Sequence, residues 1–210
     1  YAQIKDDIRA YRASKELFSF GMYRFLLGLN KKIIIANSVS ILADFTFSAT
    51  SPKVFSFMDA WTGIIAYGLQ IYFDFSAYSD MAVGLAAMAG FRFEENFNRP
   101  YISTSVREFW RRWHISLSTW LRDYLYIPLG GSKSVHAYIT YRNLFLVFLL
   151  CGIWHGANTT FVVWGLWHGI FICLERLWLE KKLNALPAFF RHAYLILIIL
   201  LGWVFFKAEN

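Results

Sequence analysis

Residues 144–174 read LFLVFLLCGIWHGANTTFVVWGLWHGIFICL, and this stretch decides the fold class. It contains no Lys, Arg, Asp or Glu, and its only basic side chains are those of His155 and His168. One helical crossing of a membrane needs roughly 20 apolar residues. The stretch is therefore long enough for one crossing and too short for two crossings joined by a loop. One long tilted helix fits it, and so does a full crossing followed by a re-entrant helix broken near Gly152 or Gly165.

Further apolar stretches and the composition point to the same class. Residues 54–73 are interrupted only by Asp59, residues 33–49 contain Asp44, and residues 193–206 are apolar but short for a crossing. The chain is 57% hydrophobic and 17% charged, with a mean hydropathy of +0.39, whereas a soluble domain carries about 25% charged residues. This balance excludes a disordered chain, a coiled coil and a disulfide scaffold. We expect an all-α, polytopic membrane protein with interfacial or re-entrant helices.

The net charge of +7 lies mainly beside the apolar stretches. Basic residues exceed acidic ones in residues 1–32 and 90–142, whereas residues 33–89 have Lys53 as their only basic side chain. Basic flanks next to apolar spans are typical of cytoplasmic loops, and a nucleic-acid binder would instead carry its basic residues on a soluble face. We therefore expect membrane lipid, and not nucleic acid, as a partner.

The predicted organisation is one membrane domain over residues 1–210, forming the central portion of a longer protein, because the sequence lacks an initial Met and stops after an apolar run. Its expected parts are an interfacial approach (1–32), membrane spans (33–90), a loop with an amphipathic helix (91–142) and further spans (143–210). In the third part, Ser105 and Glu108 form a capping-box pattern that predicts a helix to about Tyr126. Pro128 then ends it.

That predicted helix carries one aromatic face and one cationic face. The cationic face is formed by Arg107, Arg111, His114, Ser118 and Arg122, which recur at helical spacing. The helix could lie in the membrane–water interface with its Arg side chains facing lipid phosphate. Alternatively, His114 could be a reactive or orienting group, and the arginines, with Arg112, could hold a phosphorylated acyl donor.

His155 lies in the longest stretch without a formal charge, and an ionisable side chain at membrane depth is a functional hypothesis. Asn158 and Thr159, about one helical turn on, could fix the tautomer of its imidazole. The alternative is a His satisfied by hydrogen bonds between helices. On a continuous helix His168 would lie roughly 140° away from His155, so we assign it a structural role. His136 and His192 resemble ordinary solvated residues.

Residues 70–81 place Asp74 and Asp80 among aromatic residues at the end of an apolar run. These carboxylates could line a polar cavity or pair with an Arg of the following segment. A metal site is a weak prediction here because no His-x-x-x-His or Cys pair accompanies the acids. A nucleophilic Ser is equally weak because the sequence has no Gly-x-Ser-x-Gly.

Five motifs together resemble the membrane-bound O-acyltransferase family. They are YFDFSAYSDM (72–81), ENFNRPY (95–101), EFWRRWHISLS (108–118), RDYLYIPLGG (122–131) and WHG (154–156). The resemblance is strongest to the branch that O-acetylates alginate. The branch that transfers D-alanine to teichoic acid shares the WRRWH and WHG elements.

The resemblance implies a multi-helix enzyme of the bacterial inner membrane with a tunnel through its centre. An acyl thioester donor, acetyl-CoA or an acyl-carrier protein, would enter from the cytoplasm as co-substrate, without a bound cofactor or metal. The acceptor would be a hydroxyl of an exported polysaccharide or of a relay partner among periplasmic acetyltransferases and the exopolysaccharide machinery. By motif position, the family's essential His is His155 and its second His is His114.

The expected chemistry is attack of an alcohol on a thioester, for which His is the best-matched general base near neutral pH. We expect His155 to be the base and His114 to be a second acid/base or orienting group. The other expected substrate-binding side chains are Arg111, Arg112, Asn158, Trp154, Asp74 and Ser118. The candidate oxyanion donors are Asn158, Trp154 and His114. A proton-coupled transporter and a scaffold that recruits soluble acetyltransferases are the alternatives from other classes.

Overall fold

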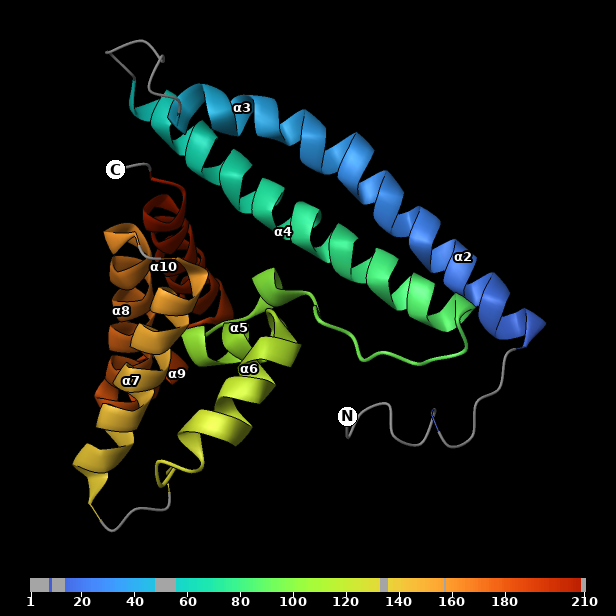
Figure 1. Cartoon of the computed structure of the whole chain (residues 1–210). Coiled ribbons are helices and arrows are strands. Elements are labelled where there is room, and N and C mark those ends of the chain that lie inside the picture. The colour runs from blue at the N-terminus through green and yellow to red at the C-terminus, as the bar shows by residue number, and fades with distance from the viewer. Residues whose placement is uncertain (1–7, 9–13, 48–55, 133–135, 157, 209–210) are drawn as a thin grey trace. The chain divides into compact units, whose positions relative to one another are not determined.

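All regular secondary structure in the described part of the computed structural model is helical (Figure 1). The structure describes residues 8, 14–47, 56–132, 136–156 and 158–208. The chain divides into two compact units, residues 1–97 and 98–210. The prediction of an all-α protein is confirmed.

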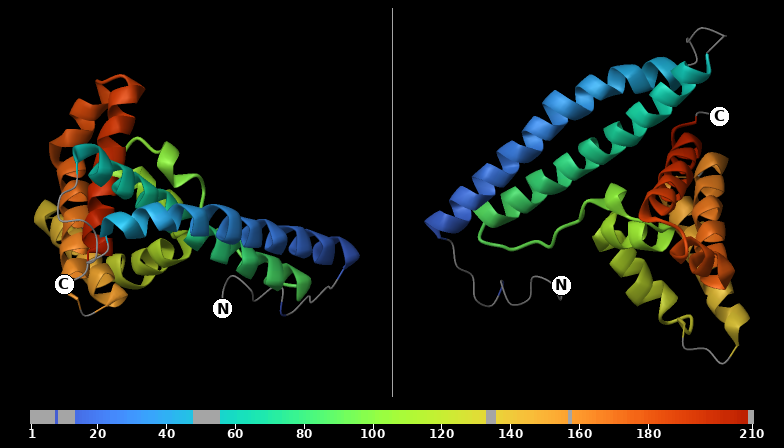
Figure 2. Two further views of the ribbon diagram at one scale, coloured as in Figure 1. Left: turned by 90° about the horizontal axis from the view of Figure 1, so that it is seen from above. Right: turned by 180° about the vertical axis from the view of Figure 1, so that it is seen from behind.

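The first unit is a pair of long helical segments that run in opposite directions. One segment comprises α2 (Lys15–Asn30), the π-helical turn η1 (Lys31–Ala36) and α3 (Asn37–Phe47), and the other is α4 (Phe57–Met88) (Figure 2). Glycines allow the two backbones to approach closely. A Cβ added to Gly21 would lie 2.5 Å from the carbonyl oxygen of Gly84, and this contact fixes how α2 and α4 cross.

The helix limits in this unit differ from the predicted ones. The sequence predicted an interfacial approach to residue 32 and a separate span from residue 33, whereas Lys15–Phe47 is one continuous helical segment. α4 begins at Phe57, where Ser56 and Asp59 form a capping box, and it continues beyond residue 73 to Met88. Residues 48–55, which include an end of the predicted spans 33–49 and 54–73, lie outside the described residues.

The second unit packs long apolar helices around an aromatic core. Its helices are η2 (Pro100–Ile102), α5 (Val106–Arg112), α6 (Ile115–Leu121), η3 (Arg122–Tyr126), α7 (Ala137–His155), α8 (Thr159–Leu174), η4 (Glu175–Leu179), α9 (Glu180–Asn184) and α10 (Ala188–Lys207). The largest fully buried side chains include Trp164 of α8, Trp203 of α10 and Phe109 of α5. The core therefore joins the short helix α5 to the long helices.

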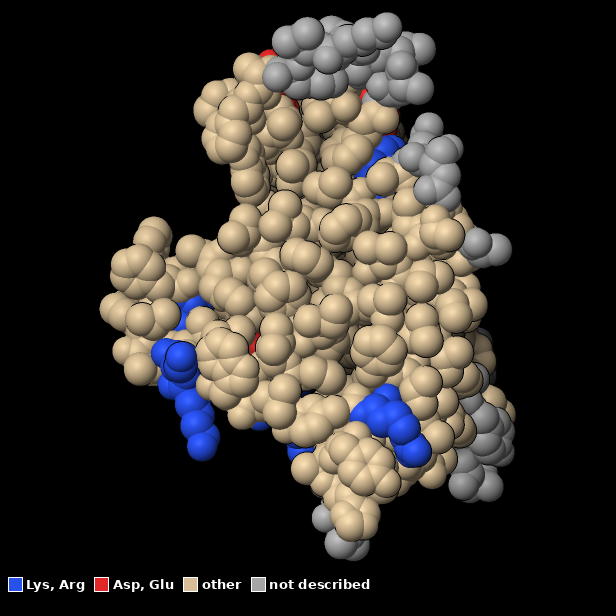
Figure 3. Space-filling model, turned by 90° about the vertical axis from the view of Figure 1, so that its left-hand side faces the viewer, with Lys and Arg blue, Asp and Glu red and all other residues tan. Residues whose placement is uncertain are grey.

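Four described helical segments are long and apolar enough to cross a membrane: Lys15–Phe47, Ala137–His155, Thr159–Asn184 and Ala188–Lys207. Many of their large apolar side chains are exposed, including Ile34, Ile41 and Ile170. In Figure 3 most of the visible surface carries neither Lys and Arg nor Asp and Glu. Exposed apolar surface of this extent is what a lipid-facing protein presents.

Residues 144–174 belong to two helices, and neither predicted arrangement is correct. α7 begins before the apolar stretch, at Ala137, and ends at His155, and α8 begins at Thr159. Because the apolar helices extend beyond both ends of the stretch, there is room for two candidate crossings. Gly152 and Gly165 do not break a helix. They are the points of contact, since a Cβ on Gly165 would lie 2.3 Å from the carbonyl oxygen of Phe148.

Gly165→Ala is therefore expected to destabilise the protein by about 2 kcal/mol, because α7 and α8 must separate to admit the methyl group. In an unconstrained helix the same change would stabilise by roughly 0.5–1 kcal/mol. Thermal unfolding of the purified protein in detergent measures the difference. Gly169→Ala is the matched control, since its nearest atom would be a side-chain carbon of Phe148 at 3.2 Å. Equal stability of Gly165→Ala and wild type would contradict the close helix contact.

Candidate active site

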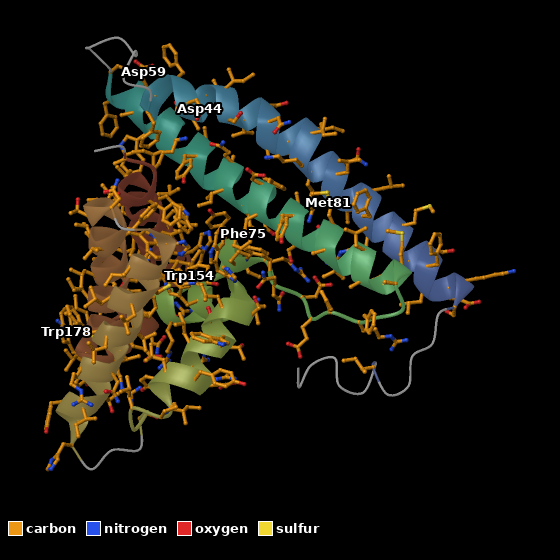
Figure 4. All side chains as sticks on the ribbon, viewed as in Figure 1. Asp44, Asp59, Phe75, Met81, Trp154 and Trp178 are labelled. Carbon is orange, nitrogen blue, oxygen red and sulfur yellow. The ribbon has the colours of Figure 1, made fainter. Side chains whose placement is uncertain are left out.

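His155 is the last residue of α7, and its imidazole lies among aromatic rings. Its ring centroid is 5.0 Å from that of Trp164 on α8 and 5.0 Å from that of Phe206 on α10, both in edge-to-face arrangement. Trp154, labelled in Figure 4, is 63% exposed and packs its ring 4.9 Å from the imidazole. His155 is half-buried, so three helices fix its ring while part of it stays accessible.

Asn158 has a different position from the predicted one. The sequence placed Asn158 one helical turn beyond His155 on the same helix, but α7 ends at His155 and Asn158 is the N-cap of α8. Its Oδ1 accepts a hydrogen bond from the backbone N–H of Thr160 at 3.0 Å. Asn158 thus forms the turn that follows His155. Residue 157 in this turn lies outside the described residues.

His114 lies at a sharp corner of the backbone, so the prediction of one helix from Ser105 to Tyr126 is wrong. α5 ends at Arg112, Trp113 is extended, and His114 has φ 47° and ψ 55°, in the left-handed region. A non-glycine residue pays roughly 1–2 kcal/mol for this conformation. Stacking of Trp113 on Phe109, with ring centroids 5.4 Å apart, and capping of α6 by His114 offset that cost.

The capping bond also defines the tautomer of His114. Its Nδ1 accepts a hydrogen bond from the backbone N–H of Leu117 at 3.4 Å, so in the neutral ring the proton is on Nε2. Burial, followed by the charge of His155, lowers the pKa of His114 to about 4. His114 is therefore neutral at physiological pH. His155 and His114 both belong to the second unit, His155 at the end of α7 and His114 at the corner before α6.

His168 shares an aromatic cluster with His155, because the chain does not form the continuous helix on which the two histidines would lie roughly 140° apart. Because the helix breaks after His155, α8 turns back, and Trp164 contacts both imidazoles, at 5.0 Å from His155 and 5.2 Å from His168. His168 is 0% exposed and packs edge-to-face on Trp110 of α5 at 5.1 Å. It links α5 to the helix on which His155 packs.

A cationic cavity of ≈ 590 Å³ lies beside α5 and α6, with walls from α7, α8 and η4. Its polar lining includes Arg107, Arg111, Ser118, Arg122, Glu175 and Arg176, and its apolar lining includes Trp110, Phe148 and Cys151. Arg107 pairs with Glu180, and Arg122 pairs with Asp123 at 2.7 Å. Arg111 and Arg176 make no ion pair with another described side chain. This cavity can bind an anion whose remainder is apolar.

Two of the predicted binding residues have structural partners in this unit. Arg112 does not line the cavity, since its guanidinium pairs with Glu108 at 2.9 Å and donates to the carbonyl oxygen of Asn98. Ser118 lines the cavity, and its hydroxyl donates to the carbonyl oxygen of Trp113 at 3.3 Å. Ser118 thereby supports the corner that carries His114.

Asp74 belongs to the first unit, where ion pairs join α4 to the first helical segment. Lys32 Nζ lies 2.6 Å from Asp74, and Asp80 pairs with Lys31 at 2.5 Å and with Arg24 at 2.8 Å. The predicted cationic partners thus come from the preceding segment and not from the following one. Phe75 and Met81 mark this part of α4 in Figure 4. Pairing lowers the cost of charges within apolar helices.

Sequence reasoning missed Glu175 and treated His192 as solvated. Glu175 is 3% exposed, and its carboxylate accepts backbone N–H groups of α5. His192 is half-buried, and its Nδ1 lies 3.1 Å from the carbonyl oxygen of Ser103. One signal for Glu175 was available: it directly follows the long uncharged stretch, where a carboxylate needs a specific partner.

Comparison with known proteins identifies the family. The family model for membrane-bound O-acyltransferases matches residues 2–206. A probable alginate O-acetylase of Pseudomonas fluorescens is 50% identical over 213 residues, which is 100% of this chain and 42% of the relative. A peptidoglycan O-acetyltransferase of Helicobacter pylori is 43% identical over 212 residues, 99% of this chain and 39% of the relative.

A teichoic acid D-alanyltransferase of Bacillus subtilis is less similar, 29% identical over 196 residues, which is 88% of this chain and 49% of the relative. The chain thus spans less than half the length of each of these relatives. The match covers both units, including the corner at His114 and the helix end at His155. The chain belongs to the membrane-bound O-acyltransferase family.

Proposed function

We propose that the protein is an acetyltransferase of the bacterial inner membrane. It moves an acetyl group from a cytoplasmic thioester donor to a hydroxyl of an exported, alginate-like polysaccharide or of a relay partner protein. The observation that supports this proposal best is that His155, at the end of α7, and His114, at the corner before α6, lie in the same unit of the chain. The relatives named as O-acetylases, at 50% and 43% identity, support acetyl as the group transferred.

In this proposal His155 is the general base. Its imidazole accepts the proton of the acceptor hydroxyl while the hydroxyl oxygen attacks the thioester carbonyl carbon. The C–S bond then breaks, and the departing thiolate takes the proton that His155 holds. A His is well matched to both transfers because its ordinary pKa is near neutrality. The aromatic rings around His155 fix the orientation of its imidazole, and they do so without forming an ion pair with it.

His114 supplies the complementary group. Because its Nδ1 is an acceptor toward Leu117, its Nε2–H is a donor that can stabilise the oxyanion formed on the thioester carbonyl. A donor that is held in place before the reaction stabilises the transition state more than a mobile donor does, because it need not reorient as the negative charge develops. The left-handed backbone at His114 is consistent with this role, since strained residues cluster at functional sites.

The cationic cavity is the proposed site of the phosphorylated part of the donor. Coenzyme A and the prosthetic arm of a carrier protein both join an anionic phosphate to a less polar chain. Arg111 and Arg176 provide charge-assisted donors for the phosphate. The apolar wall of Trp110, Phe148 and Cys151 suits the remainder of the donor.

Arg111→Gln is accordingly expected to raise the KM for acetyl-CoA about tenfold and to change kcat little, because charge-assisted hydrogen bonds contribute roughly 1.5–3 kcal/mol. Steady-state kinetics with labelled acetyl-CoA measure both constants. Arg191→Gln is the matched control, since the Arg191 guanidinium donates to Asn184 and does not line the cavity. An unchanged KM in Arg111→Gln would remove Arg111 from the donor site.

Labelled donor and acceptor polysaccharide test the function itself. Full-length protein in proteoliposomes, given acetyl-labelled acetyl-CoA or acetyl carrier protein, is expected to place label in alkali-labile esters of the polysaccharide or of a periplasmic partner. Label from a D-alanyl carrier would instead favour the teichoic acid branch. Proton flux without acyl transfer would support a transporter.

A further inference from the structure

The first turn of α5 is bound by a side chain that lies far away in the sequence. Glu175 Oε1 accepts the backbone N–H of Val106 at 2.7 Å, and Glu175 Oε2 accepts the N–H of Arg107 at 3.1 Å. Glu175 is the first residue after α8 and is almost completely buried. One carboxylate thus satisfies two consecutive helix donors that have no partner within α5 itself.

Local contacts complete the cap. Ser105 Oγ accepts the N–H of Glu108 at 3.1 Å, and the carboxylate of Glu108 accepts the N–H of Thr104 at 2.9 Å. Every N–H of the first turn of α5 is therefore bonded. A helix of seven residues is too short to be stable alone, so its position depends on such contacts and on packing.

The carboxylate of Glu175 also joins a third element. Tyr194 of α10 donates its hydroxyl proton to Glu175 Oε1 at 3.2 Å. Each carboxylate oxygen thus accepts a hydrogen bond from a donor within the chain. The effect of Glu175 on the reaction passes through α5.

The other end of α5 leads directly to the active-site corner. α5 ends at Arg112, one residue before Trp113 and two before His114. Its side chains also include Arg111, in the cationic cavity, and Trp110, which packs on His168. A short rigid helix transmits a shift of its first turn to its last, and a displacement of about 1 Å at a catalytic group can cost about 100-fold in rate.

We propose that Glu175 is a positioning residue, whose carboxylate sets α5 so that His114 lies beside His155. This inference rests on the proposed acetyltransferase function. The hydrogen bonds that Glu175 accepts from the N–H groups of Val106 and Arg107 determine the geometry of the backbone corner at His114. The ion pair that Arg107 of α5 forms with Glu180 of α9 lies closer to solvent and does not determine it.

Glu175→Gln tests the inference with little change in side-chain size. The amide can accept at one oxygen only, so one of the two α5 N–H groups loses its partner. We expect kcat to fall about 10- to 100-fold, with the KM for acetyl-CoA within about threefold of wild type. Tyr194→Phe, which removes one of three bonds, should lower kcat about threefold. Glu180→Gln is the control and should keep kcat within about twofold.

Amide hydrogen exchange supplies a readout that does not depend on activity. In Glu175→Gln, exchange at Val106 and Arg107 should accelerate at least about tenfold, while exchange in the middle of α7 stays as in wild type. Wild-type kcat in Glu175→Gln, or a change confined to KM, would overturn the positioning role. If Glu175→Gln yields no folded protein, unchanged kcat in Tyr194→Phe overturns it. Inactive wild-type protein with the expected exchange pattern would overturn the proposed function alone.

Discussion

Replacement of His155 by Ala in the full-length protein is expected to reduce the O-acetyl content of the exported polysaccharide to background. Positioned general bases contribute about 10²–10⁴-fold to rate, and no other described histidine lies at the end of α7 beside Trp164 and Phe206. The loss should appear in kcat, because the proposed donor site lies beside α5 and α6. Quantification of ester-linked acetate in the polysaccharide measures the effect.

The controls for this substitution separate chemistry from packing. The ring of His155 contacts Trp164 and Phe206, so Ala removes a core contact as well as a base. His155→Gln keeps most of the volume and should be equally inactive. His136→Ala, at an exposed histidine just before α7, should retain normal acetylation. Acetylation at wild-type levels in His155→Gln would exclude His155 as the base.

Replacement of His114 is expected to lower kcat by about 100-fold, the effect typical of removing one oxyanion donor. The choice of residue matters because His114 has a left-handed backbone and caps α6. Asn tolerates this conformation and caps helices well. His114→Asn should therefore retain wild-type thermal stability and still lose activity, whereas His114→Ala should lose both. Combined kinetics and thermal unfolding distinguish the two effects.

The pH dependence gives a second check on His114. Its pKa is lowered to about 4, so the folded protein keeps this ring neutral over the range in which an ordinary His takes up a proton. His114 thus contributes stability above its ordinary pKa of 6.5 that is lost as the pH falls toward 4. In the pH profile of kcat/KM, protonation of His114 should therefore cause no change in rate above about pH 5. A wild-type limb near pH 6.5 that disappears in His114→Asn would contradict a neutral donor.

The helical class and the two histidines could be predicted because they depend on local properties. A long apolar stretch without formal charge, such as residues 144–174, favours helices in a membrane because a helix satisfies its own backbone hydrogen bonds, and a His within it is conspicuous. The loop after Met88 and the helix start at Ser105 were likewise evident from turn and capping residues. Ser105 Oγ does accept the N–H of Glu108, as the capping pattern requires.

The corner at His114 could not be predicted because long-range contacts decide it. Nothing local forces a corner there: Trp113 and His114 could continue a helix, and the corner is held by stacking of Trp113 on Phe109 within a core that includes Trp203 of α10. The break after His155 does have local signals, since Gly156 is the C-cap of α7 and Asn158 is the N-cap of α8. Reversal of the chain there brings His168 into the same aromatic cluster.

The missed role of Glu175 has the same cause. A carboxylate at the end of an apolar helix could face solvent or a headgroup, and its partners, the N–H groups of Val106 and Arg107, are almost 70 residues away. The cations that pair with Asp74 and Asp80 could have come from either neighbouring segment. Only the antiparallel packing of α2 and η1 on α4 selects Lys32, Lys31 and Arg24.

Single-turnover acetyl transfer tests the central claim most directly. Full-length wild type and His155→Gln, in excess over labelled acetyl donor, are mixed with acceptor, and the rate of ester formation is followed beside the donor Kd. We expect an unchanged Kd and a chemical step slower by about 10³-fold in His155→Gln. Equal rates of ester formation in the two proteins would contradict this expectation.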